Sequence, residues 1–221
     1  DWSAVFPEMA EDVSETGNTN AYYRNQIEKL LELGVLFKDS KGNFYPKNPM
    51  KINDFISALC SLWKIDVSHF EKYYSSCDLT REVMAAIIYD AYLLKFGKDQ
   101  NGKWIKPDYM TKYNGSTITP DDPNYDPNLT GKEAQYYPLV GWGALTDTKS
   151  ISLEYAEKFY EVYNLGLMRS ETGIARGIMK NGTELQPKLV VTREKAAKEL
   201  WFLWVLAQTD VKAENQVLTV P

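Results

Sequence analysis

Histidine and cysteine are scarce in this sequence. The 221 residues contain one histidine, His69, and two cysteines, Cys60 and Cys77. A metal site built from several histidines is therefore excluded, and a nucleophilic triad would have to use His69, which has no nucleophile motif around it. The cysteines belong to no CxxC motif. Three alternatives remain open for them: a disulfide pair, reduced thiols in the core, or two unrelated residues.

The sequence also lacks a basic excess and a long apolar run. Its formal net charge is −5, which argues against a large nonspecific nucleic-acid footprint but is compatible with a local cationic pocket. No run of about 18 apolar residues occurs, so no membrane-spanning helix is expected. The composition, 44% hydrophobic and 25% charged, is that of an ordinary globular protein with a substantial core.

Two long stretches of the chain share one layout, namely residues 22–63 and residues 154–204. Aligned on Gly34 and Gly166, both place apolar residues at three- and four-residue steps, which predicts one buried helix face before each glycine. Each glycine stands where a helix C-cap is expected, because glycine tolerates positive φ. The matched pairs on the helix face are Tyr23 and Tyr155, Ile27 and Phe159, Leu30 and Val162, and Leu33 and Leu165.

A polar turn, a short extended piece and a second helix are predicted after each glycine. The extended pieces end at Pro46 and Pro187, and the later copy has nine extra residues before its proline, inside "SETGIARGIMK". The second helices are expected to bury matched positions: Phe55, Ile56 and Leu59 in the first copy, and Ala196, Ala197 and Leu200 in the second.

A third copy is half visible before a long polar segment. Thr80 takes the place of Thr192, while the first helix is missing or reduced to "DVSHFEKYYSS". The segment 98–138 is rich in Pro, Asn, Asp and Gly, so it is interpreted as an inserted irregular loop. The buried positions of this copy would be Met84, Ala85 and Ile88. We expect one domain over residues 1–221, with repeat one at about 6–65, a truncated repeat two at 66–97, the inserted loop at 98–138 and repeat three at 139–208.

Four stretches of the chain resemble the S-layer homology family, which usually occurs as three tandem repeats. They are "FPEM" near residue 6, "LGVLFKDSKGNFYP" at 33–46, "LTREVMAAIIY" at 79–89 and "VTREKAAKEL" at 191–200. The last two are similar to the family's Thr-Arg-Ala-Glu signature at the start of the second helix. The resemblance implies a mainly α fold: a pseudo-threefold bundle of helix-turn-short strand-helix repeats, here with a long irregular insertion.

The resemblance also implies a function. Such domains anchor surface proteins noncovalently to the bacterial cell wall, by binding an acidic secondary cell-wall polysaccharide, often pyruvylated, in grooves between repeats. The chain would then be secreted and lie at the cell surface or in the cell wall. Its partner would be this polysaccharide, with other surface-layer proteins as further candidates, and it would need no cofactor and have no catalytic role. The family's signature arginine contacts the acidic sugar, which nominates Arg81 and Arg193.

The chemistry of arginine at a helix start agrees with this role. A guanidinium fork matches a carboxylate, and a helix N-terminus adds partial positive charge and free N–H groups. Thr80 and Thr192 are expected to cap these helices through their hydroxyls. The following Glu82 and Glu194 either fix the arginine or accept hydrogen bonds from sugar hydroxyls. Repeat one has lost its arginine and leaves Lys51 as a partial substitute.

Aromatic residues are further candidates for sugar binding. Tyr23 and Tyr155 either line a groove or pack against the next repeat. Trp142 and Trp104 lie in predicted loops, where they can stack on a sugar. By contrast, Trp63, Trp201 and Trp204 are predicted to be buried at helix cores.

One stretch of the inserted loop has the oxygen spacing of a calcium-binding EF-hand. The side chains are Asp122, Asn124, Asp126, Thr130 and Glu133. Pro127 stands where such a loop needs glycine, so a solvated turn is the alternative.

Two other functions remain open. The chain is alternatively a structural or protein–protein interaction module with degenerate repeats, in which the 98–138 loop contacts a partner. An enzyme acting on cell-wall glycans has no positive support, because nothing marks two carboxylates as a pair.

Overall fold

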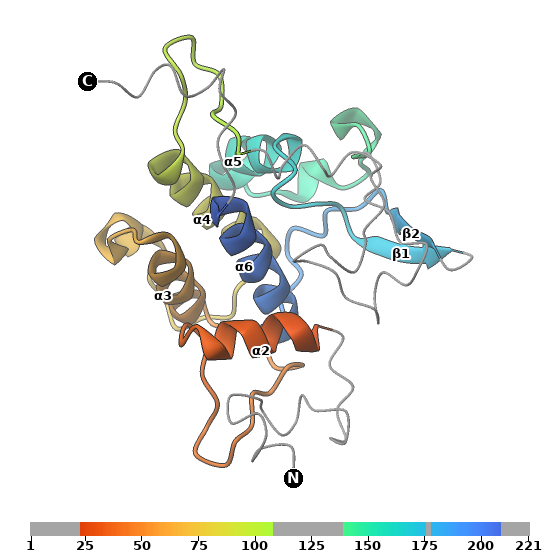
Figure 1. The fold of residues 1–221 in the computed structure, drawn as a ribbon. Helices are drawn as coiled ribbons and strands as arrows, with labels where there is room; N and C mark the ends of the chain where they lie inside the picture. The colour runs from red at the N-terminus through yellow and green to blue at the C-terminus, as the bar shows by residue number, and fades with distance from the viewer. Residues whose placement is uncertain (1–22, 108–138, 176–177, 209–221) are drawn as a thin grey trace.

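The computed structural model describes residues 23–107, 139–175 and 178–208 (Figure 1). Its helices are α2 (Arg24–Glu32), α3 (Ile52–Trp63), α4 (Arg81–Lys95), α5 (Leu153–Asn164) and α6 (Arg193–Gln208). The other elements are the 3-10 helices η1 (Val67–Tyr73), η3 (Trp142–Ala144) and η4 (Thr148–Ser150), and the antiparallel pair β1 (Thr172–Ala175) and β2 (Ile178–Asn181). The mainly α expectation is confirmed. Within these ranges, no helix is long and apolar enough to cross a membrane.

The first helix of each long copy buries the predicted face. Ile27 and Leu30 of α2, and Phe159 and Val162 of α5, are completely buried. Gly34 and Gly166 follow these helices with φ of +68° and +77°, as a left-handed C-cap requires. Leu33 was expected on the buried face but is 43% exposed, because α2 ends at Glu32 and Leu33 turns away as its cap.

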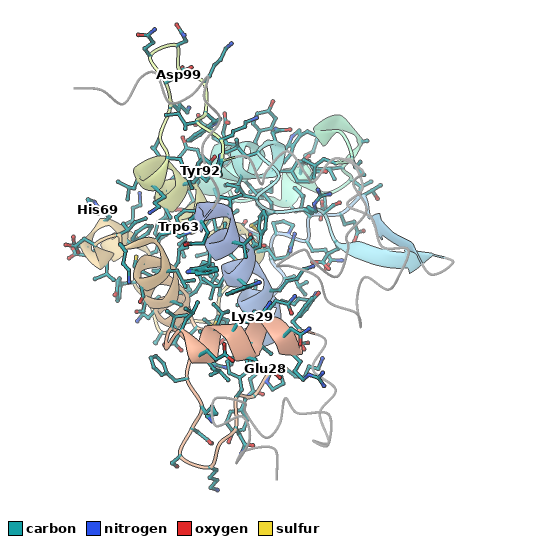
Figure 2. The ribbon with its side chains drawn as sticks, viewed as in Figure 1. Glu28, Lys29, Trp63, His69, Tyr92 and Asp99 are labelled. Atoms are coloured by element: carbon teal, nitrogen blue, oxygen red, sulfur yellow. The ribbon has the colours of Figure 1, made fainter. Side chains whose placement is uncertain are left out.

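The second helices α3, α4 and α6 contribute most of the core. Their predicted apolar positions are all buried: Phe55, Ile56 and Leu59; Met84, Ala85 and Ile88; and Ala196, Ala197 and Leu200. Trp63 of α3 is buried as predicted and donates its indole N–H to the carbonyl of Leu203 in α6 at 2.9 Å. Its ring also meets the edge of Tyr92 from α4 at 6.4 Å, so these two residues join three helices in the interior (Figure 2).

A closed cycle of backbone hydrogen bonds joins the starts of these three helices. Met50 donates to the carbonyl of Val191 at 2.9 Å, Val191 donates to Leu79 at 2.8 Å, and Leu79 donates to Met50 at 2.7 Å. Each of the three residues lies two positions before α3, α6 or α4. The cycle therefore brings together the N-termini of three core helices from distant parts of the chain.

The helices α2 and α5 pack mainly on a second helix from elsewhere in the chain. α2 packs against α6, α5 packs against α4, and η1 packs against α3 and α4 (Figure 1). The stretch reduced to "DVSHFEKYYSS" in the sequence is thus a short 3-10 helix that occupies a place comparable to α2 and α5.

The short strand predicted in each copy is not a strand in the described residues. Tyr45 and Gln186, which occupy matched positions before the prolines, have φ of +58° and +49° and interrupt the extended backbone. Extended pairing occurs a few residues later, as the isolated bridges Pro49–Thr192, Lys51–Asp78 and Thr80–Val190.

Two insertions leave this framework intact. The stretch between Glu171 and Gly182, where the later copy has its extra residues, contains the antiparallel strands β1 and β2. The amide of Gly182 donates to the carbonyl of Glu171, as Gly42 does to Asp39 in the shorter copy. After α4, the first part of the 98–138 segment packs on that helix, since Tyr92 donates its hydroxyl to the carbonyl of Ile105 at 2.6 Å.

Candidate functional site

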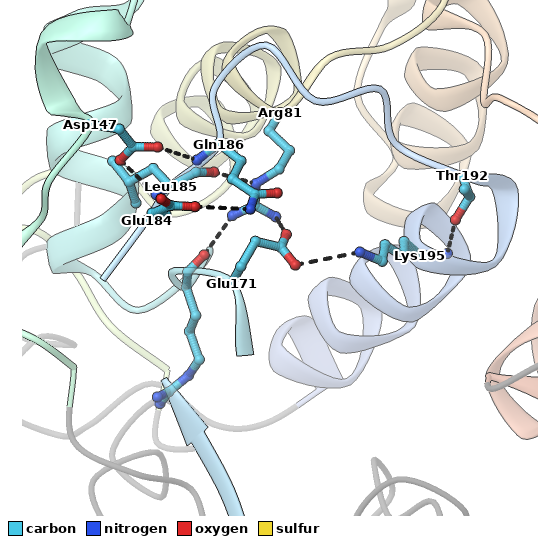
Figure 3. Close-up of polar contacts among 9 residues, drawn as sticks. Arg81, Asp147, Glu171, Glu184, Leu185, Gln186, Thr192 and Lys195 are labelled. Carbon is cyan, nitrogen blue, oxygen red and sulfur yellow. Dashed lines mark hydrogen bonds and ion pairs between the residues drawn. The ribbon is translucent and has the colours of Figure 1, made fainter. Parts of the chain in front are cut away.

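Arg81 is the first residue of α4 and holds the loop that follows α5. Its Nε and Nη2 donate to the carbonyls of Leu185 and Arg169, both at 2.6 Å. Its Nη1 lies 3.1 Å from a carboxylate oxygen of Glu171 (Figure 3). The side chain is only 12% exposed, and this burial lowers the pKa of Arg81, while the charges of Glu171, Glu199 and Asp147 oppose the shift. The guanidinium is therefore a fixed positive charge between two parts of the chain.

Arg193 repeats this arrangement at the start of α6. Its Nε donates to the carbonyl of Phe44 at 2.9 Å and its Nη2 to the carbonyl of Phe37 at 3.3 Å. Phe44 and Phe37 occupy the positions in the first copy that Leu185 and Arg169 occupy in the later copy. The guanidinium carbon also lies 4.4 Å from the ring centre of Phe44, which adds a cation–π contact.

The first two amides of α4 and of α6 are not free, contrary to the sequence-based expectation. In α4 the amides of Arg81 and Glu82 donate to the carbonyls of Leu189 and Pro187, both at 3.0 Å. The amides of Arg193 and Glu194 in α6 donate to Asn48 and Pro46 at 2.8 and 3.0 Å. Distant segments of the chain therefore already satisfy these four N–H groups, which are not available to a ligand.

The threonine caps also differ from the expectation. Thr80 makes no side-chain cap hydrogen bond, although its backbone is extended as in a capping residue. Thr192 accepts from the amide of Lys195 at 3.4 Å, which is a long bond (Figure 3). Capping through the hydroxyl loses importance because neighbouring carbonyls have taken the first two amides.

The signature glutamates are buried and paired away from their arginines. Glu82 is 5% exposed and accepts from the amide and hydroxyl of Ser152 at 2.9 and 3.0 Å and from Lys188 at 2.5 Å. Glu194 is 4% exposed and accepts from Lys47 at 2.6 Å. Lys188 and Lys47 each follow the proline of their loops. The two glutamates therefore make matched ion pairs with residues far away in the sequence.

The third helix start, at α3, lacks these features. Ile52 stands at the arginine position and is 7% exposed. Lys51 precedes it, and its ammonium lies 2.5 Å from Asp78. Asn53, at the glutamate position, accepts from the amide of Ser75 at 2.8 Å. The helix start is thus fixed by neutral and exposed contacts, without a buried guanidinium.

A hollow of about 350 Å³, called here the Arg193 groove, lies beside Arg193. Phe37 and Tyr45 are 70% and 43% exposed along it, and the Tyr45 hydroxyl donates to Asp39 at 2.6 Å. The lining residues are Val35–Asp39, Asn43–Tyr45, Asp54, Ser57 and Arg193. Among these described residues, the two cations Lys38 and Arg193 balance the carboxylates of Asp39 and Asp54.

A smaller hollow of about 110 Å³, called here the Arg81 pocket, lies beside Arg81. Lys195 of α6 reaches Glu171 at 3.4 Å across this pocket (Figure 3). The lining residues are Tyr23, Arg81, Met84, Arg169–Glu171, Leu189–Val191, Lys195, Lys198 and Glu199. Among these described residues, four cations stand against the carboxyl groups of Glu171 and Glu199.

The two hollows occupy equivalent places in the framework but differ in charge. Counted from Met50 and Val191 of the backbone cycle, Asp54 and Ser57 of α3 correspond to Lys195 and Lys198 of α6. The Arg193 groove therefore offers aromatic surface and balanced charge, which suits a neutral sugar ring. The Arg81 pocket offers excess positive charge, which suits a carboxylate.

The other aromatic residues that were predicted to bind sugar lie in different surroundings. Tyr23 lines the Arg81 pocket, where Lys198 lies 5.0 Å from its ring centre. Tyr155 is partly buried against the core. Trp142 contacts the edges of Tyr160 and Tyr163 at 5.1 and 5.6 Å and lines neither hollow described above. Trp104 donates its indole N–H to Glu161 at 2.8 Å, so its polar edge is already engaged.

The remaining sequence candidates give no site in the described residues. Asp122, Asn124, Asp126 and Glu133 of the calcium candidate lie outside the described ranges. Inside them, no cluster of three metal-ligating side chains occurs. Cys60 is buried and Cys77 is exposed, and both are free thiols rather than a disulfide pair. Burial raises the pKa of the Cys60 thiol to about 11.

Several lining residues were missed in the sequence. Phe37 had a signal, since it is a large apolar side chain directly before the polar stretch 38–43. Lys195, Lys198 and Glu199 had a weaker one, because they become unusual only when α6 is compared position by position with α3 and α4.

Comparison with known proteins supports a surface-associated role. The family model of the S-layer homology domain matches residues 17–51. This match covers a single segment and supports S-layer homology, cell-wall anchoring and surface localisation. S-layer homology domains are binding modules for cell-wall polysaccharide. No curated protein matches the chain.

Proposed function

We propose that this chain anchors a surface protein noncovalently to the bacterial cell wall, by binding an acidic, pyruvylated secondary cell-wall polysaccharide in grooves between three pseudo-threefold repeats. The ligand-binding residues would include Arg81, Arg193 and Tyr23. The proposal involves no catalytic step and no cofactor.

The observation that carries this proposal is the pair of equivalent arginine sites. Arg81 and Arg193 each start a core helix, each bond two carbonyls of another copy, and each lie at the edge of a hollow. The backbone cycle through Met50, Leu79 and Val191 supports a threefold arrangement of the repeats around them. The S-layer homology match at residues 17–51 also supports the anchoring function.

The two hollows suggest a division of the ligand. The Arg81 pocket would take a carboxylate, such as that of a pyruvate ketal, against Lys195 and Lys198. The Arg193 groove would take a neutral ring, with Phe37 and Tyr45 as stacking surfaces. In both places the arginine, largely buried at Arg81 and partly buried at Arg193, supplies a fixed charge and holds the wall, while more exposed side chains meet the ligand.

The test is cosedimentation with purified cell-wall sacculi, using native polymer and polymer whose acid-labile ketals have been removed. The informative variants avoid the arginines, because their loss would disturb the fold. Lys195→Gln with Lys198→Gln removes two charges from the Arg81 pocket, and Phe37→Ala removes a 70% exposed ring from the Arg193 groove. We expect each to weaken binding at least about tenfold, the equivalent of one lost charge-assisted or stacking contact.

Matched controls distinguish the hollows from general surface effects. Lys103→Gln with Lys149→Gln makes the same change in net charge at exposed sites outside both hollows. Tyr74→Ala removes another exposed ring, on the chain after η1. These variants should sediment like the unmodified protein. Binding that survives ketal removal, or that the controls weaken equally, would contradict the proposal.

The scaffold alternative is favoured by one observation. The guanidinium of Arg81 is largely buried and already bonded to two carbonyls and to Glu171. The signature residues would then serve only to hold the copies together. Failure of the unmodified protein to bind several pyruvylated wall preparations would select this alternative, with a protein partner as the next target.

A further inference from the structure

Glu199 is an acidic residue in a place where the other core helices are apolar. It lies eight positions after Val191 of the backbone cycle. The equivalent positions in α3 and α4, eight residues after Met50 and Leu79, are Ala58 and Ile87, which are 1% and 0% exposed. A carboxyl group at such a position opposes packing, so its presence in α6 calls for a role.

The carboxyl group of Glu199 is incompletely satisfied. Its Oε1 is closed off from solvent and has no hydrogen-bond partner among the residues that the structure describes. Burial raises the pKa of Glu199 to about 8, although the positive charges of Lys198 and Arg81 lower it. The protonated form of the group therefore predominates at neutral pH, and its O–H is a donor.

The surroundings of Glu199 are mostly cationic. It lines the Arg81 pocket, whose volume of about 110 Å³ is that of a small acid rather than of a whole sugar chain. The charged and titratable groups that line the pocket with it are Arg81 from α4, Lys195 and Lys198 from α6, Arg169 and Glu171 from the segment after α5, and Tyr23 from the chain before α2.

We propose that the Arg81 pocket binds a carboxylate together with one proton, which Glu199 carries and shares with the bound anion. In this arrangement the Glu199 O–H donates to one carboxylate oxygen, while Lys195 and Lys198 neutralise the charge. The inference rests on the proposed function in assigning that carboxylate to the ketal of a wall polysaccharide. It extends the proposal by making binding depend on pH through one named residue.

The sign of the pH dependence follows from the charges. Below about pH 8 Glu199 is neutral, so an incoming carboxylate meets a donor and an excess of cations. Above that pH the unliganded pocket gains a second carboxylate, and binding then requires uptake of a proton. Affinity should be flat on the acid side and fall up to about tenfold for each pH unit on the alkaline side, as linkage of one proton requires.

The experiment measures carboxylate affinity against pH for two ligands. One is a saccharide fragment bearing a pyruvate ketal, followed by calorimetry between pH 6.5 and 9.5. The other is pyruvate itself as a sugar-free probe, followed by amide chemical shifts of α6. Glu199→Gln keeps a neutral donor and should hold acid-side affinity across the range. Glu157→Gln, an exposed change on α5, should titrate like the unmodified protein.

Each outcome decides between the two proposals. Saccharide binding that is independent of pH, or that still falls above pH 8 in Glu199→Gln, overturns the role of Glu199 and leaves the anchoring function standing. Pyruvate binding with Glu199-dependent proton uptake, without saccharide binding, supports the pocket and contradicts the anchoring function. Absence of binding by either ligand at any pH overturns both.

Discussion

The Arg81 and Arg193 sites share one framework but carry different surfaces. Both arginines bond two carbonyls of a neighbouring copy, and both following glutamates pair with a lysine beside a proline. Yet the Arg81 pocket is small and cationic, while the Arg193 groove is three times as large, partly aromatic and balanced in charge. The geometry that the two sites share holds distant segments of the chain together. In the proposed function, the features that differ would determine what each site binds.

The largest effect should come from removing the arginines one at a time. Arg81→Ala leaves two carbonyls and Glu171 without their shared cation in a site that is only 12% exposed, and should reduce the free energy of unfolding by about 3–5 kcal/mol. Arg193→Ala, at the more open groove, should lose about 1–3 kcal/mol. Urea unfolding followed by circular dichroism measures both. A larger loss for Arg193→Ala would reverse the inferred order of burial.

Only the Arg81 pocket contains Glu199, so this site should make the free energy of unfolding depend on pH. Its folded-state pKa of about 8 lies above the ordinary value of 4.5, so the unmodified protein is destabilised progressively as pH rises from 4.5 through 8. Glu199→Gln removes this loss and should be more stable than the unmodified protein by about 2–4 kcal/mol at pH 9, with little difference at pH 4.5. Thermal unfolding across this range gives the comparison. A constant difference at all pH values would show that Glu199 does not titrate there.

The helix-ending glycines should respond equally at the two sites. Gly34 and Gly166 have φ of +68° and +77°, and a Cβ at either would meet nothing within 4 Å. Backbone strain alone should therefore reduce the free energy of unfolding by about 1 kcal/mol for either alanine substitution. Denaturant unfolding of the two single variants measures this. A clearly unequal pair of losses would mean that the two copies are less equivalent than their backbone geometry indicates.

The smallest effect should come from the threonine hydroxyls. Thr192 accepts a long hydrogen bond of 3.4 Å from Lys195, and Thr80 makes no capping bond. Thr192→Val should lose about 0.5 kcal/mol, below the usual loss for an N-cap, and Thr80→Val should be close to neutral. The same unfolding experiment tests both. A loss above about 1 kcal/mol for Thr80→Val would point to a capping role in solution.

Sequence periodicity was sufficient to predict the buried faces of the helices. The steps of three and four residues placed Ile27, Phe159, Phe55 and Leu200 correctly in the core, because helix faces are a local property. The glycine alignment identified the two C-caps for the same reason. Arg81 and Arg193 were singled out differently, by the resemblance of their stretches to the family's Thr-Arg-Ala-Glu signature.

The partners of these arginines were not predictable from local pattern. Leu185 and Phe44 offer backbone carbonyls, which every residue has, and they lie 104 and 149 positions from the arginines that bind them. The same long-range contacts explain why the first helix amides are already hydrogen-bonded and why the Thr80 hydroxyl makes no capping bond. Glu199 was not predicted because charged residues are common on helices. It is unusual only because the equivalent positions of α3 and α4 hold the buried residues Ala58 and Ile87.

The backbone cycle has a consequence for how the chain acquires its fold. Met50 is bonded to Val191, and α2 packs on α6, so the first described helix is completed by the last. Closing such a long loop carries an entropic penalty that no early local contact offsets. We therefore expect slow folding with a high contact order, in which the core forms only after α6 has left the ribosome. Chains truncated before α6 should expose the apolar faces of α2 and α3 and aggregate.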